Sequence, residues 1–242
     1  MPIRNRKYAL LALLAVLAGL ALLLAGPRDR HERIGLFTTL PILWAESADL
    51  GELVRGEAPP HWARAALAAR ESIVPLDSLA RIEALDLLLI AQPRPLSPQE
   101  NVALDAWVRN GGRAVILADP MLTAESLFPL GDRRRPQNVV LLSPLLTHWG
   151  VRLSFDDGQS FGRHDVPLLG IKLPVNLPGT LAVTDLAQGC AAMDKGIAVR
   201  CRIGRGHVLV AADAALLEGP QTDSESQAQT ALNTLLDAVR AD

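Results

Sequence analysis

The sequence predicts an α/β protein with a mostly parallel central sheet and helices on both faces. Short apolar runs alternate along the chain with amphipathic helical segments, which is the pattern of repeated strand–helix–strand units. The clearest unit spans residues 86–120, where strand, helix, glycine stop and second strand follow one another. With 242 residues, 49% of them hydrophobic, the chain is long enough to bury the core of one sizeable domain.

The first half of this unit is predicted from its local signals. Leu87 to Ala91 is a wholly apolar run, typical of a strand that is covered on both faces of a parallel sheet. Ser97 supplies an N-cap oxygen, and Pro98 occupies the first helical position, where its missing N–H costs nothing. Glu100 completes a capping box with Ser97. The sequence therefore predicts a helix that begins at Pro98.

The end of this helix and the other elements follow from similar signals. Gly111 and Gly112 stop the helix because glycine accepts a positive φ. The remaining predicted strands are residues 34–38, 72–76, 114–118, 151–155, 181–183, 189–193, 197–202 and 207–212, and the remaining predicted helices are 60–70, 121–128, 143–150 and a terminal helix whose capping box is Thr222 and Glu225. Strands 189–193 and 197–202 form a late antiparallel hairpin, and residues 156–179 are expected to be irregular or a small β subdomain.

The amino-terminal residues predict a membrane anchor. Residues 8–26 carry no charge, and a helix of that length spans a bilayer core of about 30 Å at about 1.5 Å per residue. The basic flank, residues 1–7, is expected to stay in the cytoplasm, so that a spacer at 27–33 leads into an exported domain at 34–242. A cleaved signal peptide is the alternative, although signal peptides have apolar regions of about 7–15 residues and Pro27 directly follows the candidate cleavage site.

The charge of the exported part argues against nucleic acid as a partner. Arg4, Arg6 and Lys7 precede the predicted anchor, which leaves 21 basic against 26 acidic residues, a net charge of about −5. Proteins that bind nucleic acid through its phosphates carry a basic patch or stripe instead. We therefore expect no nucleic-acid partner.

The two cysteines, Cys190 and Cys201, are candidates for a disulfide. If Lys195 and Gly196 form a two-residue hairpin turn, the two cysteines face each other across the hairpin. Such cross-strand separations suit a disulfide, and an oxidising compartment permits one. The alternative is two unrelated buried thiols.

No catalytic, cofactor-binding or metal-binding motif stands out. The sequence lacks a G-x-S-x-G elbow, an H-E-x-x-H helix and a phosphate-binding loop, and its five histidines are scattered without metal-ligand spacing. Asp119 and Asp213 each follow a predicted buried strand, and ligands of open α/β sheets bind beyond the carboxyl ends of the strands. The two aspartates are therefore the candidate pocket for a small ligand or a partner loop. Alternatively, each one caps the start of a loop or helix through its side chain.

Four segments carry a resemblance to a known family. They are W-V-x-N-G-G at 107–112, Asp-Pro at 119–120, S-P-L-L-x-x-W-G-V at 143–151 and G-R-G-H-V-L-V-A-A-D at 204–213. In this order they resemble the auxiliary proteins of uncharacterised ABC transport systems, which include gliding-motility-type auxiliary subunits and bacterial membrane-anchored domains of unknown function. The resemblance implies a flavodoxin-like, class I glutamine amidotransferase-like domain over most of residues 34–240. It also implies a single-pass protein of the bacterial inner membrane whose partners are ABC permease or ATPase subunits and whose main domain is periplasmic.

The residues at the expected nucleophile position argue against amidotransferase chemistry. In that fold a nucleophilic Cys occupies the turn after the strand that follows a helix such as 98–110, and here residues 117–120 read Leu-Ala-Asp-Pro. An ionised Asp119 only accepts hydrogen bonds, and Pro120 lacks the N–H that could serve an oxyanion hole. The sequence therefore predicts a non-catalytic accessory or recognition module. The alternatives are an envelope hydrolase with a carboxylate-based site and a cleaved, soluble periplasmic ligand-binding protein.

Overall fold

The computed structural model describes residues 32–46, 60–184, 189–218 and 225–241. They belong to one compact unit, whose first strand begins at Glu32, two residues before the predicted start. The predicted cytoplasmic flank, the anchor at 8–26 and Thr222 lie outside the described residues. In the described part of the chain, no helix combines the length and the apolar content needed to cross a bilayer.

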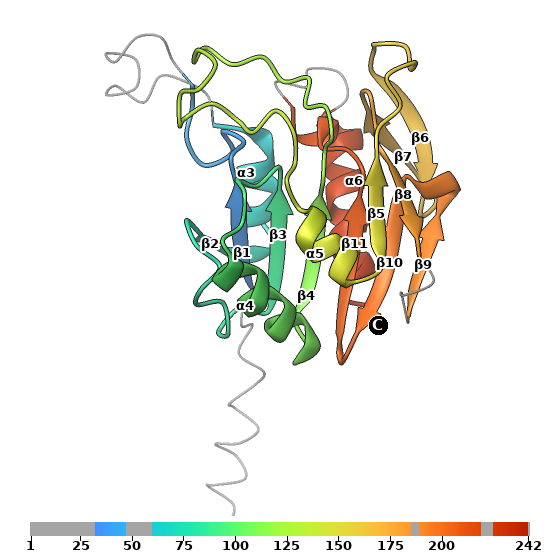
Figure 1. The fold of residues 1–242 in the computed structure, drawn as a ribbon. Helices are drawn as coiled ribbons and strands as arrows, with labels where there is room; N and C mark the ends of the chain where they lie inside the picture. Colours follow the sequence, from blue (N-terminus) through green and yellow to red (C-terminus); the bar gives the residue numbers. More distant parts are fainter. Residues whose placement is uncertain (1–31, 47–59, 185–188, 219–224, 242) are drawn as a thin grey trace, which may run out of the picture. The chain divides into compact units, whose positions relative to one another are not determined.

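A seven-stranded sheet runs through this unit in the order β2-β1-β3-β4-β11-β10-β9 (Figure 1). Strands β1 to β4 and β11 are parallel, whereas β10 and β9 run antiparallel to their neighbours. The prediction of an α/β protein with a mostly parallel sheet is confirmed. The strands of the sheet are β1 (Glu32–Thr38), β2 (Glu71–Pro75), β3 (Leu87–Ala91), β4 (Arg113–Leu117), β9 (Cys190–Met193), β10 (Ala198–Ile203) and β11 (Gly206–Ala211).

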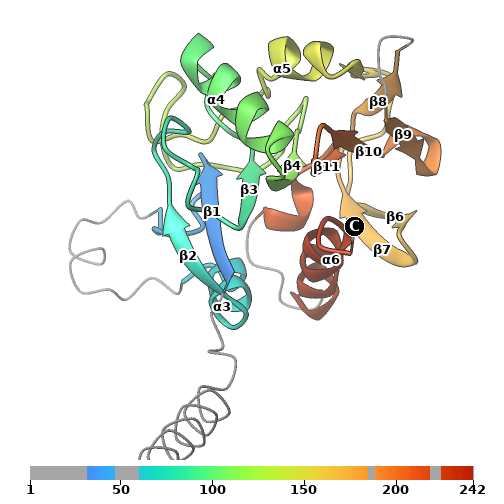
Figure 2. The ribbon, with the colours of Figure 1, turned by 90° about the horizontal axis from the view of Figure 1, so that it is seen from below.

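Helices cover both faces of the sheet, as Figure 2 shows in a view from below. On one face lie α3 (Trp62–Ala68) and α6 (Glu225–Ala238), and on the other α4 (Pro98–Arg109) and α5 (Ser143–His148). Because successive side chains of a strand point to opposite faces, β3 contributes Leu87 and Leu89 to the first core and Leu88 and Ile90 to the second. Helices on both faces are therefore confirmed.

The predicted capping box of α4 is present and extends beyond the helix. The Ser97 side chain accepts from the Glu100 N–H at 3.2 Å, and Glu100 Oε2 accepts from the Ser97 N–H at 2.9 Å. The same carboxylate receives both Nη atoms of Arg94, at 2.7 and 2.9 Å, and the Leu79 N–H at 3.2 Å. The Arg94 guanidinium holds the pKa of Glu100 well below its usual range.

No helix connects β2 to β3 on the α4 face of the sheet. Residues 76–86 form turns instead, and Leu79, Ile82 and Leu85 from this segment are buried in the core under α4. Gly35 in β1 makes room for them, since a Cβ at Gly35 would lie 2.5 Å from Leu85 Cδ1. A glycine in the interior of a strand is therefore required by the loop that crosses it.

The segment between α5 and β9 builds two small antiparallel sheets. Strand β5 (Val151–Ser154) pairs with β8 (Thr180–Val183), and β6 (His164–Leu168) pairs with β7 (Ile171–Val175). Residues 156–179, which we expected to be irregular or a small β subdomain, thus contain the β6–β7 hairpin. The two pairs extend the unit beside β10 and β9 (Figure 1).

Cys190 and Cys201 are cross-strand partners on β9 and β10, and a disulfide joins them at a Cα–Cα distance of 4.0 Å. The expected two-residue turn was wrong. The connection is a 3₁₀ turn, Asp194–Gly196, in which all three residues have positive φ. The register across the hairpin is nevertheless the one that the sequence predicts, with Ala198 opposite Met193.

Removing this disulfide should destabilise the domain. We expect the double variant Cys190→Ala/Cys201→Ala to lose about 2–3 kcal/mol of unfolding free energy, because the bridge restricts a short loop in the unfolded chain. Urea denaturation with and without dithiothreitol measures the loss. The reductant should shift the unfolding midpoint of the wild type and leave that of the double variant unchanged, and an equal shift in both proteins would contradict the assignment.

Candidate functional site

Three buried polar side chains meet at the carboxyl ends of the central parallel strands. Gln92 follows β3, Asp119 follows β4, and Asp213 follows β11. Strand β4 pairs with both β3 and β11, with Leu117 opposite Ala91 and Ala211, so the three residues lie at neighbouring strand ends. Gln92 and Asp119 are 0% exposed and Asp213 is 1% exposed. The two predicted aspartates thus lie just beyond the ends of adjacent strands and are buried.

Both carboxylate oxygens of Asp119 and of Asp213 accept hydrogen bonds from backbone N–H groups. Asp119 Oδ1 accepts from the Met121 N–H at 2.8 Å, and Oδ2 accepts from the Ala214 N–H at 3.1 Å. Asp213 Oδ1 accepts from the Ala215 N–H at 2.6 Å, and Oδ2 accepts from the Asn176 N–H at 2.9 Å. Each aspartate therefore caps the turn that follows it and also fixes a loop from another part of the chain, which is the geometry of the capping alternative.

Glu218 is a third buried carboxylate at this edge, and no motif in the sequence pointed to it. It follows the short 3₁₀ helix η2 (Ala215–Leu217) and is 7% exposed. Its oxygens accept from the Thr123 N–H at 2.9 Å, the Thr123 hydroxyl at 2.7 Å and the Ala124 N–H at 3.0 Å. Arg163 Nη2 lies 3.7 Å from Glu218 Oε2 and forms an ion pair with it. Glu218 thus fixes the loop after β4 at Thr123 and Ala124.

Burial raises the pKa of both aspartates, so their simultaneous ionisation is unfavourable. Burial raises the pKa of Asp119 to about 7, against the lowering effect of its two N–H donors, and the negative charge of Glu218 raises it further. Burial also raises the pKa of Asp213 well above its ordinary value, and the charge of Asp119 adds to the rise. Two neighbouring buried carboxyl groups titrate as a pair, so we expect the pair to retain a proton in mildly acidic solution.

Gln92 occupies the left-handed turn of this edge. Its φ is +43°, whereas none of residues 117–120, where we expected the nucleophile turn, has a positive φ. Its amide nitrogen donates to the carbonyls of Asp119 at 3.1 Å and Gln137 at 2.7 Å, and its amide oxygen accepts from the Asp119 N–H at 3.1 Å. The turn after β3, which leads toward α4, therefore carries a buried glutamine. Its side chain joins the backbone at Asp119 to the backbone at Gln137 and so braces the loop after β4. The only sequence signal for it was a Gln-Pro pair directly after an apolar strand.

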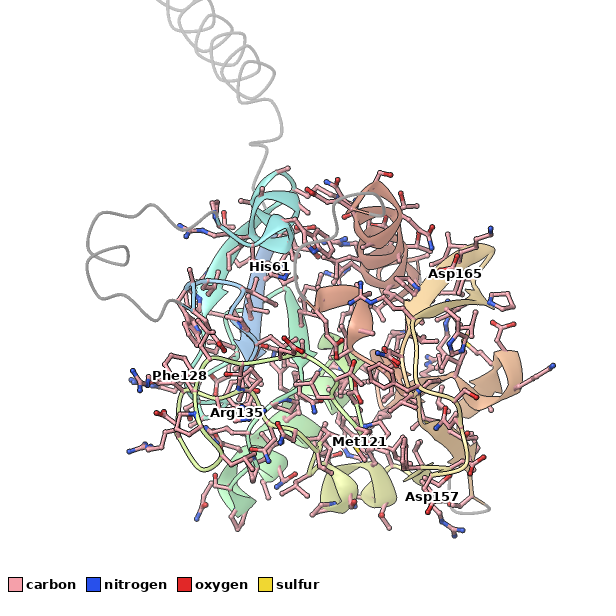
Figure 3. All side chains as sticks on the ribbon, turned by 90° about the horizontal axis from the view of Figure 1, so that it is seen from above. His61, Met121, Phe128, Arg135, Asp157 and Asp165 are labelled. Atoms are coloured by element: carbon pink, nitrogen blue, oxygen red, sulfur yellow. A yellow bond between two sulfur atoms is a disulfide. The ribbon has the colours of Figure 1, made fainter. Side chains whose placement is uncertain are left out.

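The loop after β4 covers this edge and fills the space beyond the strand ends. The Thr39 hydroxyl donates to the Gln92 carbonyl and accepts from the Gln137 N–H at 3.0 Å. The Val140 N–H donates to the Asp119 carbonyl at 3.0 Å, which closes the loop at its base. Figure 3 looks down on this edge and shows Met121, Phe128 and Arg135 on the loop that crosses it.

The short helix predicted at 121–128 was wrong. These residues form part of the long loop 119–142, which has no helix or strand. Two N–H groups that a helix over 121–128 would use are bound to distant carboxylates instead: Ala124 donates to Glu218 at 3.0 Å, and Leu127 donates to Glu46 at 2.7 Å. Charged acceptors form stronger hydrogen bonds than backbone carbonyls, so they hold the segment out of the helix.

A groove lies at the other end of the sheet. Its volume is about 530 Å³, and it lies between the turn at 82–86 and the end of α4, with Trp107 and Arg113 among its lining residues. Neither Asp119 nor Asp213 lines it. In the described residues, no group of three or more His, Cys, Asp or Glu side chains could hold a metal ion. Asp119 and Asp213, at 0% and 1% exposed, form a closed cluster at their own end of the sheet.

Replacing Gln92 should loosen the loop that it braces. We expect Gln92→Ala to lower the free energy of unfolding by about 2 kcal/mol, because the buried Asp119 N–H loses its acceptor. Amide hydrogen exchange should become faster at residues 135–140 before the rest of the domain opens. The matched control is Gln99→Ala, since Gln99 is exposed on α4. Unchanged exchange in Gln92→Ala would show that the brace is dispensable.

Several solved structures resemble this chain at low sequence identity. The exo-β-1,4-mannosidase Op5Man5 from Opitutaceae bacterium strain TAV5 is 14% identical, with a TM-score of 0.50 over 86% of this chain and 36% of that chain. The cytoplasmic protein STM3548 from Salmonella typhimurium is 11% identical, with a TM-score of 0.45 over 84% of this chain and 97% of that chain. This chain thus spans only about a third of the mannosidase. At 14% identity, the likeness to the mannosidase is one of fold alone.

The sequence comparisons point to transport. No curated protein sequence matches the chain. A family model described as an ABC-type uncharacterized transport system matches residues 63–157. The matched stretch begins in α3, includes Gln92, Asp119 and the loop 119–142, and ends just after β5. Over this stretch, the chain is similar to auxiliary components of ABC transport systems.

Proposed function

We propose that this protein is a non-catalytic accessory or recognition module of an ABC-type transport system, with permease or ATPase subunits as its partners. The observation that carries the proposal is the family match over residues 63–157, which include the braced strand ends and the loop above them. At that edge, both oxygens of Asp119 and of Asp213 accept backbone N–H groups. Carboxylates whose oxygens are all hydrogen-bonded to the backbone suit a role in fixing the shape of a binding surface better than a role in binding or converting a substrate.

The proposal includes attachment to the bacterial inner membrane through residues 8–26, with the amino terminus in the cytoplasm and the main domain in the periplasm. The disulfide between Cys190 and Cys201 supports export, because disulfides persist in oxidising compartments. The apolar length of residues 8–26 supports an anchor. A cleaved, soluble ligand-binding protein is the alternative, and the amino-terminal sequence of the mature protein distinguishes the two.

We also propose that the domain is flavodoxin-like, with the variation that class I glutamine amidotransferases show. Its parallel strands have the order β2-β1-β3-β4-β11, which corresponds to the order 2-1-3-4-5 of flavodoxin-like sheets. The turns at 76–86 replace the helix that would otherwise join β2 to β3.

A carboxylate-based envelope hydrolase is the second candidate function. One observation favours it: the pKa of Asp119 is raised to about 7, near the value that suits a general acid or base. Against it stand the complete burial of Asp119 and the capping bonds of both its oxygens. A general acid must reach a substrate, so we retain the accessory role.

Purification of the full-length chain from detergent-solubilised membranes tests the accessory role. We expect permease or ATPase subunits of an ABC system to co-purify in a fixed ratio and to be identified by mass spectrometry. The matched control is the fragment 1–33 fused to an unrelated soluble domain, which shares the predicted anchor and lacks the α/β domain. Absence of any such subunit, or equal recovery with the control, would overturn the proposal.

A further inference from the structure

We propose that Trp44 and residues 127–135 form a docking surface for an acidic, leucine-containing segment of a partner protein. We call these residues the loop-tip surface. The inference deepens the proposed function, because it places the contact with the transport system on one face of this chain. It rests on four features of the loop: its length, its fixed shape, its exposed apolar side chains and its charge.

The loop that carries this surface is long and has no helix or strand. It runs from Asp119 to Leu142, and connections longer than about 12–15 residues without regular structure are uncommon in compact domains. Such loops are usually functional or disordered. This one is held at its base by Asp119 and Glu218 and is closed by the bond from Leu122 N–H to the Asn138 carbonyl at 2.9 Å. Its length therefore points to a function.

The tip of the loop is also fixed in shape. Glu46 accepts from the Leu127 N–H at 2.7 Å and from the Ser126 hydroxyl at 3.0 Å. Arg135 Nη1 donates to the Phe128 carbonyl at 2.6 Å. A surface that is ordered before binding loses less conformational entropy when a partner docks. The tip is thus preorganised by charged groups from two different segments.

The side chains displayed at the tip are those that protein interfaces favour. Leu130 is 78% exposed, Leu127 is 62% exposed and Trp44 is 41% exposed. The Trp44 and Phe128 rings lie 6.0 Å apart, and the Arg134 guanidinium lies 4.1 Å from the Phe128 ring centroid. Aromatic residues make up only 4% of the chain, yet two of them meet here beside an arginine. Aromatic residues and arginine are enriched in interfaces and at their energetic hot spots.

The exposed charge at the tip that lacks a described partner is basic. Residues 125–135 contain three arginines together with Glu125 and Asp132, and Glu46 also hydrogen-bonds to the tip. Asp132 pairs with Arg134 at 2.7 Å. Arg133 is exposed and has no hydrogen bond or ion pair with any described residue. Its guanidinium is therefore available to a carboxylate that a partner brings, next to apolar side chains that the partner would cover.

A protein segment fits this surface better than an anionic membrane. Electrostatic binding to anionic lipids uses clusters of about 4–8 basic residues, and the loop has three. We therefore commit to a protein segment that combines carboxylates with leucine-like side chains.

Site-specific photo-crosslinking in the full-length, membrane-expressed protein tests the proposal. Leu130 is replaced by p-benzoylphenylalanine, and Val102, which is 70% exposed on α4, receives the same replacement as the matched control. We expect the probe at 130 to crosslink to an acidic segment of a permease or ATPase subunit, at least fivefold more than the probe at 102. Arg133→Glu should reduce the crosslink at 130 at least fivefold, and an acidic-to-Lys change in the crosslinked partner segment should restore it.

The outcomes separate this inference from the proposed function. A crosslink at 130 to an acidic segment of an unrelated protein supports the docking surface and overturns the transport role. Co-purified transport subunits that crosslink through 102 and not through 130 support the transport role and overturn the docking surface. Absence of a crosslink at 130, or binding to phosphatidylserine vesicles that Arg133→Glu abolishes, also overturns it. Thermal unfolding of Arg133→Glu should match that of the wild type, because Arg133 has no bond to lose among the described residues.

Discussion

The variant Arg240→Met is expected to lose about 3–5 kcal/mol of unfolding free energy, because it removes one partner of a buried ion pair. Arg240 follows α6, and its guanidinium donates to Glu71 Oε1 on β2 at 2.6 Å and to Glu32 Oε2 on β1 at 2.6 Å. The Glu71 side chain is only 1% exposed. Without Arg240, its carboxylate stays out of water and keeps only the longer ion pair with Arg70, whose Nε atom is 3.9 Å away.

Urea denaturation measures this effect, and two further variants define its cause. Arg64→Met should change stability by less than about 0.5 kcal/mol, since Arg64 is exposed on α3. Glu71→Met/Arg240→Met should recover most of the loss, because no charge is then left buried. If the double variant is as unstable as Arg240→Met, the loss comes from packing of the arginine stem and the ion-pair explanation fails.

The second large effect concerns pH and the pair Asp119 and Asp213. The folded-state pKa of Asp119 is raised to about 7, from 3.8. The folded state therefore holds a proton that the unfolded state has already released between about pH 4 and 7, and the wild type should lose stability as pH rises through that window. A shift of this size corresponds to at most about 4 kcal/mol. Asp213, whose pKa burial also raises, adds to the loss as it ionises in turn.

The variant Asp119→Asn should reverse its rank against the wild type within this window. At pH 5 it should be less stable by about 1 kcal/mol, because one of the N–H groups of Met121 and Ala214 loses its acceptor. At pH 8 it should be at least as stable as the wild type, since one of two adjacent buried charges is gone. Thermal unfolding of both proteins at several pH values measures the crossing.

His61 contributes to the same pH profile with the opposite sign. Burial lowers its pKa, so its contribution is present above about pH 6.5 and is lost on acidification. The difference between wild type and Asp119→Asn removes this term, because both proteins contain His61. The control is Asp157→Asn, at an exposed loop carboxylate, which should leave the profile unchanged. Parallel profiles for the wild type and Asp119→Asn would show that Asp119 titrates normally.

The features that sequence predicted well are set by neighbouring residues. Helix α4 begins at Pro98 with the capping box of Ser97 and Glu100, because cap, proline and glutamate lie within one turn. Strand β3 occupies residues 87–91, as its apolar run indicates. The positions of Asp119 and Asp213 at adjacent strand ends follow from the parallel sheet. Whether they line a pocket or cap a loop depends on donors that the local sequence does not contain.

The features that sequence missed are set by residues far apart in the chain. The N–H groups of Ala124 and Leu127 bind Glu218 and Glu46, which are 94 and 81 positions away, so no window around 121–128 could exclude a helix. Gln92 acquires its role only when the loop brings the Gln137 carbonyl over it. Glu32, which we assigned to the spacer, belongs to β1, where its backbone pairs with Glu71 of β2 and its carboxylate binds Arg113 and Arg240.

The carboxylate of Glu100 has a consequence for how this domain can evolve. Capping boxes accept Glu and Gln alike at this position. Here the two oxygens also hold Arg94 and the Leu79 N–H, and a glutamine amide would present hydrogens where one of those donors arrives. Homologues are therefore expected to keep Glu100 wherever they keep Arg94 and the turns at 76–86. The start of α4 and the turns at 76–86 are therefore expected to be conserved together.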